Sequence, residues 1–182
     1  MNENVGRCLE EIFSSDRTIQ GDAYQSLMKE TESPVDWAYE AWDDLLKGLS
    51  HKDNHVRSIA SQLLCNLAVS DPEARIRDAF DPLLAVTKDE RFVTARHCLL
   101  SLWKIGLAGE DRREMVVAGL AHRFAEAAEE KNGTLIRFDI SQGLRKLYDH
   151  SRDETIREQA LALIESEPDL KYRKKYAGVW KK

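Results

Sequence analysis

The residue types that perform chemistry in enzymes are present in this chain, but their spacing matches no catalytic or metal-binding motif. His51 and His55 are four positions apart, as two metal ligands on one helix would be, but the pair spans a predicted turn at Lys52-Asp53. No second ligand pair lies nearby, and the sequence contains neither HExxH nor CxxC. We therefore predict no metal, no cofactor and no catalytic residue.

The sequence also lacks the local signatures of enzymes that use a serine nucleophile or transfer phosphate. It has no nucleophile elbow and no glycine-rich phosphate loop, and its nine glycines are scattered. A Ser-His-acid triad is assembled in space, so the absence of a motif bears on it only indirectly. We expect the chain not to be an enzyme.

Helices must hold these residues in place, because no alternating apolar and polar strand pattern of useful length occurs. Short polar breaks such as Ser14-Ser15-Asp16 and Lys131-Asn132-Gly133 contain residues that cap a helix or accept a left-handed backbone. The absence of long linkers predicts one continuous domain over residues 1–182. The predicted helices are 3–14, 17–31, 35–48, 53–69, 73–87, 90–107, 110–130, 133–150, 153–166 and 169–180.

One helical pattern returns along the chain at intervals of roughly 40 residues. The pattern Val56-Arg57-x-x-Ala60-x-x-x-Leu64 has counterparts that begin at Ile19, Thr94 and Ile136. Such a period, with helical spacing inside each copy, indicates stacked helix pairs that bury their apolar faces against one another. The core positions predicted from this register are Ala60, Leu64, Leu67, Leu102, Ile105, Leu144 and Leu147.

The segment 45–68, together with Phe80-Asp81-Pro82, resembles a HEAT repeat, and the resemblance covers most of residues 17–166. It implies an all-α fold: a right-handed α-α superhelix, or solenoid, of about four HEAT-like helix pairs with a C-terminal helical cap at 153–166. In that family the Asp and Arg of the motif stabilise the turn and the contact between neighbouring repeats. By resemblance, this structural role falls to Asp53 and Arg57 and to Asp153 and Arg157.

The spacing of these motif residues adds an expectation of its own. Each arginine lies four residues after an aspartate at a helix start, which predicts an ion pair within the helix. Gln20 occupies the arginine position in the first copy, and Asp89 has no arginine partner within its own copy.

Charge divides between the two helices of each predicted pair. The chain has a net charge of −5; the first helices of repeats two to four are acidic, whereas the second helices are neutral to weakly basic. By resemblance, second helices line the concave side of the stack. We therefore expect a partner-binding groove that contains Arg96, Lys104, Arg145 and Lys146.

These features predict a non-catalytic protein-protein interaction scaffold or adaptor that binds another protein or a peptide, acidic ones included, on its concave face. The alternative is a nucleic-acid-acting enzyme resembling the HEAT-like alkylpurine DNA glycosylases, which use aromatic and acidic residues in a basic groove. Here Trp103 precedes Lys104, no aspartate follows on the same helix at one-turn spacing, and the body of the chain is acidic. Nucleic acid is thus not the expected partner.

The C-terminal segment 170–182 is basic and aromatic, with six lysines and arginines and no acid after residue 170. Tyr172, Tyr176 and Trp180 recur at helical spacing, so a helix would place them along one face. Two interpretations are open: the aromatic face docks on the end of the solenoid, or the aromatic and basic side chains together bind a polyanion.

Several features favour a cytoplasmic location. No apolar run approaches the roughly 20 residues of a membrane helix, and the N-terminus lacks the basic and apolar regions of a signal peptide. The chain has three cysteines, an odd number, and they lie far apart in the sequence, as expected for reduced thiols: Cys8, Cys65 and Cys98. We expect no membrane partner.

Overall fold

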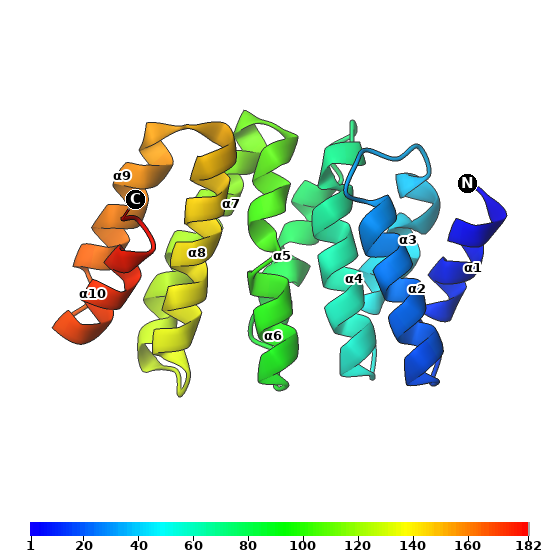
Figure 1. Ribbon diagram of the computed structural model, residues 1–182, viewed down its shortest axis with the longest axis horizontal. Coiled ribbons are helices and arrows are strands. Elements are labelled where there is room, and N and C mark those ends of the chain that lie inside the picture. The colour runs from blue at the N-terminus through cyan, green and yellow to red at the C-terminus, as the bar shows by residue number, and fades with distance from the viewer. Residues whose placement is uncertain (182) are drawn as a thin grey trace. The chain divides into compact units, whose positions relative to one another are not determined.

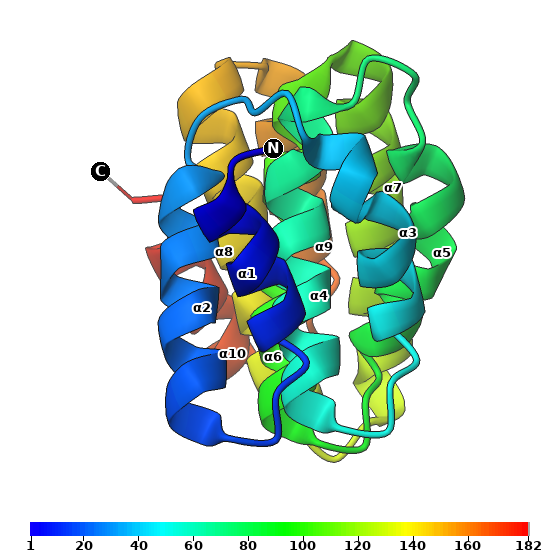
Figure 2. The same ribbon diagram turned by 90° about the vertical axis from the view of Figure 1, so that its right-hand side faces the viewer.

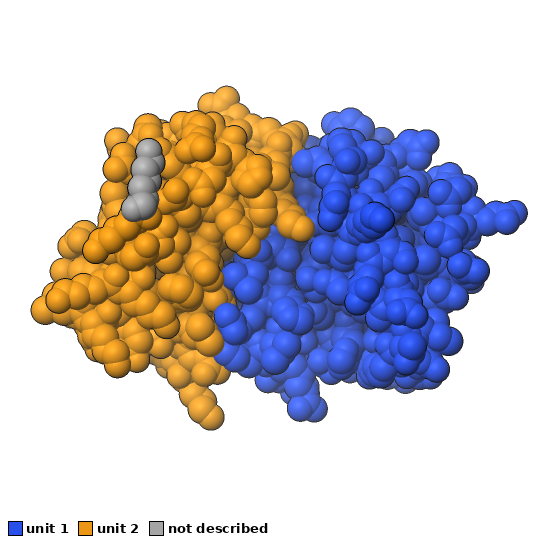
Figure 3. Space-filling model, in the orientation of Figure 1, with its two compact units in different colours: residues 1–101 blue, residues 102–182 orange. Residues whose placement is uncertain are grey.

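The computed structural model describes residues 1–181, and within that range every regular element is a helix (Figure 1). The predicted all-α class is therefore confirmed. The chain forms two compact units, residues 1–101 and residues 102–182 (Figure 3). The expectation of one continuous domain stays a prediction.

The first unit consists of three helix pairs. Its second helices contact one another in the order α2, α4, α6, and α4 also packs on α3 and α5. Figure 2 looks at this unit from its N-terminal end, with α3 and α5 together on one side and α2 on the other. The elements are α1 (Glu3–Glu11), α2 (Arg17–Glu30), α3 (Ala38–Gly48), α4 (Asn54–Leu67), the short 3₁₀ helix η1 (Ala68–Ser70), α5 (Ile76–Val86) and α6 (Phe92–Leu99).

The second unit contains two further pairs. Helix α7 contacts α9 and α8 contacts α10, so α9 and α10 form a fifth pair where the sequence predicted a cap after four. The elements are η2 (Leu102–Ala108), α7 (Glu110–Glu126), η3 (Ala127–Glu129), α8 (Gly133–Ser151), α9 (Glu154–Glu165) and α10 (Leu170–Gly178).

Aspartate N-caps explain where four of the helices begin. Asp16, Asp53, Asp153 and Asp169 have extended backbone, and each carboxylate accepts a hydrogen bond from the N–H two residues on. These bonds satisfy donors that the first helical turn cannot pair internally. The predicted starts of these helices therefore agree with the structure to within one residue.

The prediction of a single helix over 90–107 is wrong. Helix α6 ends at Leu99, and a 3₁₀ helix begins at Leu102. At the break, the Ser101 N–H bonds the carbonyl three residues back on Cys98, and its hydroxyl donates to the His97 carbonyl at 2.9 Å. A serine hydroxyl that competes for a helix carbonyl favours such an interruption.

The predicted core positions are confirmed within each unit. Ala60, Leu64 and Leu67 are at most 1% exposed in the first unit, and Leu102, Ile105, Leu144 and Leu147 are equally buried in the second. Trp37 and Trp42 are also buried, as packing residues would be. The repeat register derived from the sequence is therefore correct at these positions.

Arg57 connects successive repeats and does not form the predicted pair with Asp53. Its Nε and Nη2 atoms bond both carboxylate oxygens of Asp89, at 2.5 and 2.9 Å, and Nη1 donates to the His51 carbonyl at 2.8 Å. Asp53 uses its carboxylate to cap α4 and to pair with Arg17 at 2.7 Å. The motif therefore stabilises the turn and the inter-repeat contact, as the resemblance implied, but with partners from neighbouring repeats.

Arg137 repeats this arrangement in the second unit. Its Nε donates to the Phe124 carbonyl at 2.9 Å and its Nη1 to the Glu167 carboxylate at 2.7 Å. Gln20 performs part of the same role at the first copy, because its Nε2 donates to the Ile12 carbonyl at 2.8 Å. A side-chain donor at this position thus binds a carbonyl near the C-terminal end of the preceding helix in all three places, in the turn just after it for Arg57.

Asp153 and Arg157 do not form the predicted repeat motif. They lie at the start of α9, which is the first helix of its pair, whereas the motif belongs to second helices. Asp153 caps α9 and lies 3.8 Å from Arg113, and exposed Arg157 pairs with Glu154 at 3.2 Å. The sequence resembles the motif here because a capping aspartate serves either kind of helix equally well.

The C-terminal segment docks on the second unit. Helix α10 packs on α8 and α9, and Tyr176 is fully buried, with its hydroxyl donating to the Thr134 carbonyl at 2.9 Å. Trp180 donates from Nε1 to the Ser141 hydroxyl at 3.1 Å. The docking interpretation is confirmed, and polyanion binding by the exposed lysines of α10 stays untested.

We expect Arg57→Ala to destabilise the protein far more than Arg157→Ala. Loss of Arg57 leaves the Asp89 carboxylate, which is only 5% exposed, without its ionic partner. This loss should lower the free energy of unfolding by about 3 kcal/mol. Arg157 is a matched control because its ion pair is exposed and should contribute little. Urea denaturation of both variants measures the difference, and equal losses would contradict the inter-repeat role.

The same pair predicts a pH dependence. The Arg57 guanidinium holds the pKa of Asp89 below its ordinary 3.8, so its stabilising effect is present above that value. It is lost as the pH falls through the lowered folded-state pKa.

Docking of α10 predicts a graded effect at Tyr176. Tyr176→Ala should lower the free energy of unfolding by about 3 kcal/mol or more, and Tyr176→Phe, which removes one hydrogen bond, by about 1 kcal/mol. Lys174→Ala, exposed on the same helix, is the control and should change little. Thermal denaturation tests the order; a Tyr176→Ala variant as stable as the control would rule docking out.

Candidate functional site

The four predicted groove residues divide between the two units. Arg96 lies on α6 of the first unit and is half-buried, while Lys104, Arg145 and Lys146 belong to the second. Arg145 pairs with Asp149 at 2.9 Å and donates to the Val179 carbonyl at 3.3 Å, so it helps to hold the C-terminal segment. Exposed Lys146 lies 5.9 Å from the Trp103 ring centre. Their role in partner binding stays a prediction.

A row of polar side chains crosses the second-helix layer of the first unit. Tyr24 on α2 donates to Gln62 on α4 at 2.9 Å. Gln62 donates from Nε2 to the Ser58 carbonyl at 3.0 Å and to the Ser58 hydroxyl at 3.2 Å. The Ser58 hydroxyl lies 2.9 Å from Nδ1 of His97 on α6. We call Tyr24, Gln62, Ser58 and His97 the polar row.

Hydrogen-bond accounting assigns a direction to the bonds that Gln62 makes in the polar row. Gln62 accepts from Tyr24 and donates to Ser58. The Ser58 hydroxyl keeps its proton and a second lone pair, so it can either donate to His97 Nδ1 or accept from it, according to the tautomer of the ring. Because burial raises the pKa of Tyr24, its hydroxyl stays protonated and can donate. The row therefore has neutral members with fixed orientations.

The row borders a hollow of about 240 Å³ between the second helices. Gly21, Ser58, Ile59 and the exposed His55 are among the residues that line it. Arg17 also lines it but is held by Asp53 and by Gln20, at 2.7 and 2.8 Å. None of the residues that line this hollow is acidic.

His97 has an environment that disfavours its charged form. Burial of the ring, then nearby Arg96 and then His55, lower the pKa of His97 below its ordinary 6.5. This shift favours the neutral ring. At neutral pH the site therefore presents an uncharged imidazole donor beside cationic neighbours.

The sequence contained a partial signal for this site that was not recognised. His55, Ser58 and Gln62 recur at helical spacing on a helix whose other positions are mostly buried, so they form a polar stripe. Tyr24 and His97 have no comparable local pattern. Only stacking of α2, α4 and α6 brings them to the stripe.

Comparisons with known proteins define the fold class and leave the family open. No family model matches the chain, and no curated protein matches it. Among solved structures, it is similar to an engineered protein with 17% identity and a TM-score of 0.54, covering 98% of this chain and 95% of the other. A second engineered protein has 19% identity and a TM-score of 0.53, covering 98% and 52%.

A third similar structure is a designed armadillo repeat protein in complex with the peptide (KR)4. It has 16% identity and a TM-score of 0.52, covering 98% of this chain and 88% of the other. These likenesses show that the fold is a helical repeat of the α-solenoid type. They do not distinguish the HEAT resemblance from other helical repeats.

Metal sites and membrane-spanning helices are two other features to consider in the part of the chain that the structure describes. Residues 1–181 contain no group of three or more histidine, cysteine, aspartate or glutamate side chains placed to hold a metal ion. Within the same residues, no helix is long and apolar enough to cross a membrane.

We expect His97 to titrate below pH 6.5 in an NMR titration of the histidine rings. Because its folded-state pKa is lowered, the unfolded chain takes up the proton first. The free energy of unfolding should therefore fall as the pH drops through 6.5 toward the folded-state pKa. Arg96→Gln should raise the His97 pKa, whereas Lys29→Gln, with the same change of charge, should not. A His97 pKa at or above 6.5 would contradict a neutral ring at this site.

Proposed function

We propose that this protein is a non-catalytic scaffold that binds an extended peptide along the polar row of its first unit. The observation that carries the proposal is the continuous hydrogen-bonded row across three stacked helices, bordering a hollow that no carboxylate lines. The designed armadillo repeat protein supports it, because a protein of similar fold forms a complex with a peptide.

The row presents groups that match a peptide backbone. The neutral His97 ring has one N–H donor, and the oxygens of Tyr24 and Gln62 each retain acceptor capacity. An extended chain advances about 3.3 Å per residue and neighbouring helices lie about 8–10 Å apart, so each helix would meet roughly two to three peptide residues. Backbone recognition of this kind fits an extended segment better than a helix, whose own backbone groups are already paired.

Charge favours a peptide with acidic side chains. The hollow has cationic or protonatable neighbours in Arg17, Arg96 and His55, and none of its lining residues is acidic. The peptide in the designed complex is (KR)4, and the polar row has no carboxylates to pair with such a sequence. We therefore expect acidic or neutral peptides on the row.

A serine next to a histidine also raises the question of acyl transfer. Ser58 lies beyond the first turn of α4, where backbone N–H groups are paired within the helix and cannot converge on an oxyanion. The hollow also has no carboxylate among its lining residues to orient His97. We therefore propose a binding role for this pair.

The test is a selection of random octapeptides on the full-length protein, followed by affinity measurement by fluorescence anisotropy. We expect binders of the row to lose at least tenfold in affinity in Tyr24→Phe/His97→Phe, which keeps both rings and removes the polar contacts, about 1.4 kcal/mol or more. The sensitive peptides should be rich in Asp and Glu. Gln25→Ala, exposed on α2 away from the row, is the control.

Two results would contradict the proposal. One is a set of selected peptides whose affinities are the same for wild type and for the double variant at unchanged melting temperature. The other is a set of sensitive peptides that is rich in lysine and arginine.

A further inference from the structure

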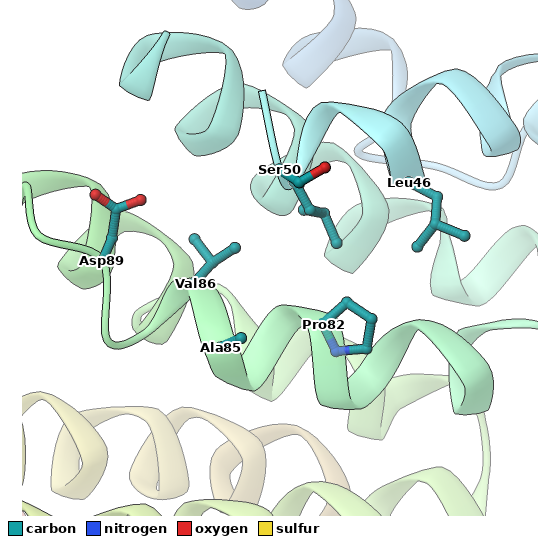
Figure 4. Close-up of a pocket in the computed structure, with 7 residues that line it drawn as sticks. Leu46, Ser50, Pro82, Ala85, Val86 and Asp89 are labelled. Carbon is teal, nitrogen blue, oxygen red and sulfur yellow. The ribbon is translucent and has the colours of Figure 1, made fainter. Parts of the chain in front are cut away.

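The first helices of the first unit leave an apolar groove between α3 and α5, with a volume of about 410 Å³. Figure 4 shows Leu46 and Ser50 on one side, facing Pro82, Ala85 and Val86 across the space. Most of the surface that lines it is carbon. The groove lies on the other helix layer from the polar row and is chemically its opposite.

Residue sizes and the proline explain why α3 and α5 do not close on each other. Pro82, Ala85 and Val86 lie on one stripe of α5, and only Val86 among them extends far enough to be buried. Leu46 opposite is half-exposed. Proline also donates no backbone hydrogen bond, so the Asp78 carbonyl one turn earlier receives none from position 82. The groove therefore has an open apolar floor.

Two bridges hold the groove open, one near each end. At one end the Tyr39 hydroxyl donates to Asp71 at 2.6 Å and accepts from the Glu73 N–H at 2.8 Å, which ties α3 to the start of α5. At the other end Asp89 is fixed by Arg57. Because both ends are braced, the space is preformed and a ligand would not have to separate the helices.

The rim of the groove is acidic. The stripe of α3 that bears Leu46 continues to Asp43, and the stripe of α5 continues to Asp78 and Asp81; all three carboxylates are exposed. Nearby Arg75 already pairs with Glu73 at 3.0 Å and lies over the Tyr39 ring. Helices α3 and α5 together have five acids and two bases, so the rim attracts cations.

We infer that this groove docks a basic segment of a partner protein, with one apolar side chain in the groove and flanking lysines or arginines on the rim. An apolar anchor gains from the carbon floor, and cationic neighbours gain from Asp43, Asp78 and Asp81. The basic tail of this chain is not the occupant, because Tyr176 at its centre is fully buried within the second unit. The proposal does not depend on peptide binding by the polar row.

The probes are three fluorescein-labelled peptides: KRALARK, its Leu→Ser version KRASARK, and the charge-reversed EEALAEE. Anisotropy with the full-length protein at low salt should show binding of KRALARK that weakens as salt rises. KRASARK should bind at least tenfold more weakly, and EEALAEE should not bind at this groove. Amide NMR shifts upon addition of KRALARK should concentrate on α3 and α5.

Two protein variants with matched controls separate the apolar from the ionic contribution. Ala85→Phe fills the groove from an exposed position and should weaken KRALARK binding at least tenfold, whereas Ala162→Phe, exposed on α9, should not. Asp43→Asn/Asp81→Asn should weaken binding and flatten its salt dependence, whereas Asp22→Asn, exposed on α2, should not.

The inference fails if KRALARK does not bind, if KRASARK binds equally well, or if Ala85→Phe has no effect at unchanged melting temperature. It also fails if the amide shifts fall on α2, α4 and α6 instead. Tyr24→Phe/His97→Phe should leave KRALARK affinity unchanged, which distinguishes this surface from the polar row.

Discussion

The ion pair that an arginine near the start of a second helix forms with the next repeat is the interaction on which the register of successive repeats depends. Arg57 and Arg137 each bind a carbonyl near the C-terminal end of the preceding helix and a carboxylate of the next repeat; Arg57 binds Asp89 through two nitrogens, and Arg137 binds Glu167 through one. Apolar packing between helices has no direction of its own, whereas a planar guanidinium accepts few geometries. The arginine thus fixes where the following second helix begins. In the first unit, both the alignment of the polar row and one end of the apolar groove follow from it.

Helix positions and core residues were predictable from the sequence because capping and helical periodicity are local properties. The partners of Arg57 were not predictable in the same way. The carboxylate of Asp53, its neighbour in sequence, caps α4, and Asp89, the carboxylate that Arg57 binds, lies far along the chain. Asp153 was misassigned for a related reason: its local pattern fits either helix of a pair, and only packing shows that α9 is a first helix. The break after Leu99 depends on one serine hydroxyl. Of the site, only the stripe on α4 was visible in advance.

The two layers of the first unit present different chemistry because they meet different structural demands. Helix α4 packs against the second helices on both sides of it, α2 and α6, as well as against the first helices α3 and α5. Polar side chains on α4 can therefore reach α2 and α6. Between α3 and α5, contact is made mainly through Tyr39 at one end, and the space beyond it stays open. A neutral row with cationic neighbours and an apolar groove with an acidic rim therefore differ in the ligands that each would favour. Two partners could be distinguished by charge alone.

The repeat itself indicates that the polar row is not a requirement of the fold. Ser58 follows the arginine Arg57 by one position, and His97 follows the carboxylate Asp89 by eight. In the second unit the residues at the same offsets from Arg137 and Glu167 are Phe138 and Lys175, and they meet as well: the Lys175 ammonium lies 4.6 Å from the Phe138 ring centre. The scaffold thus brings these two positions together in both units and accepts either a hydrogen bond or a cation-π contact between them. Either pairing is compatible with a stable fold. The serine and histidine of the first unit, together with Gln62 and Tyr24, therefore indicate a requirement other than folding. A surface that must present fixed, uncharged hydrogen-bonding groups to a peptide backbone supplies such a requirement.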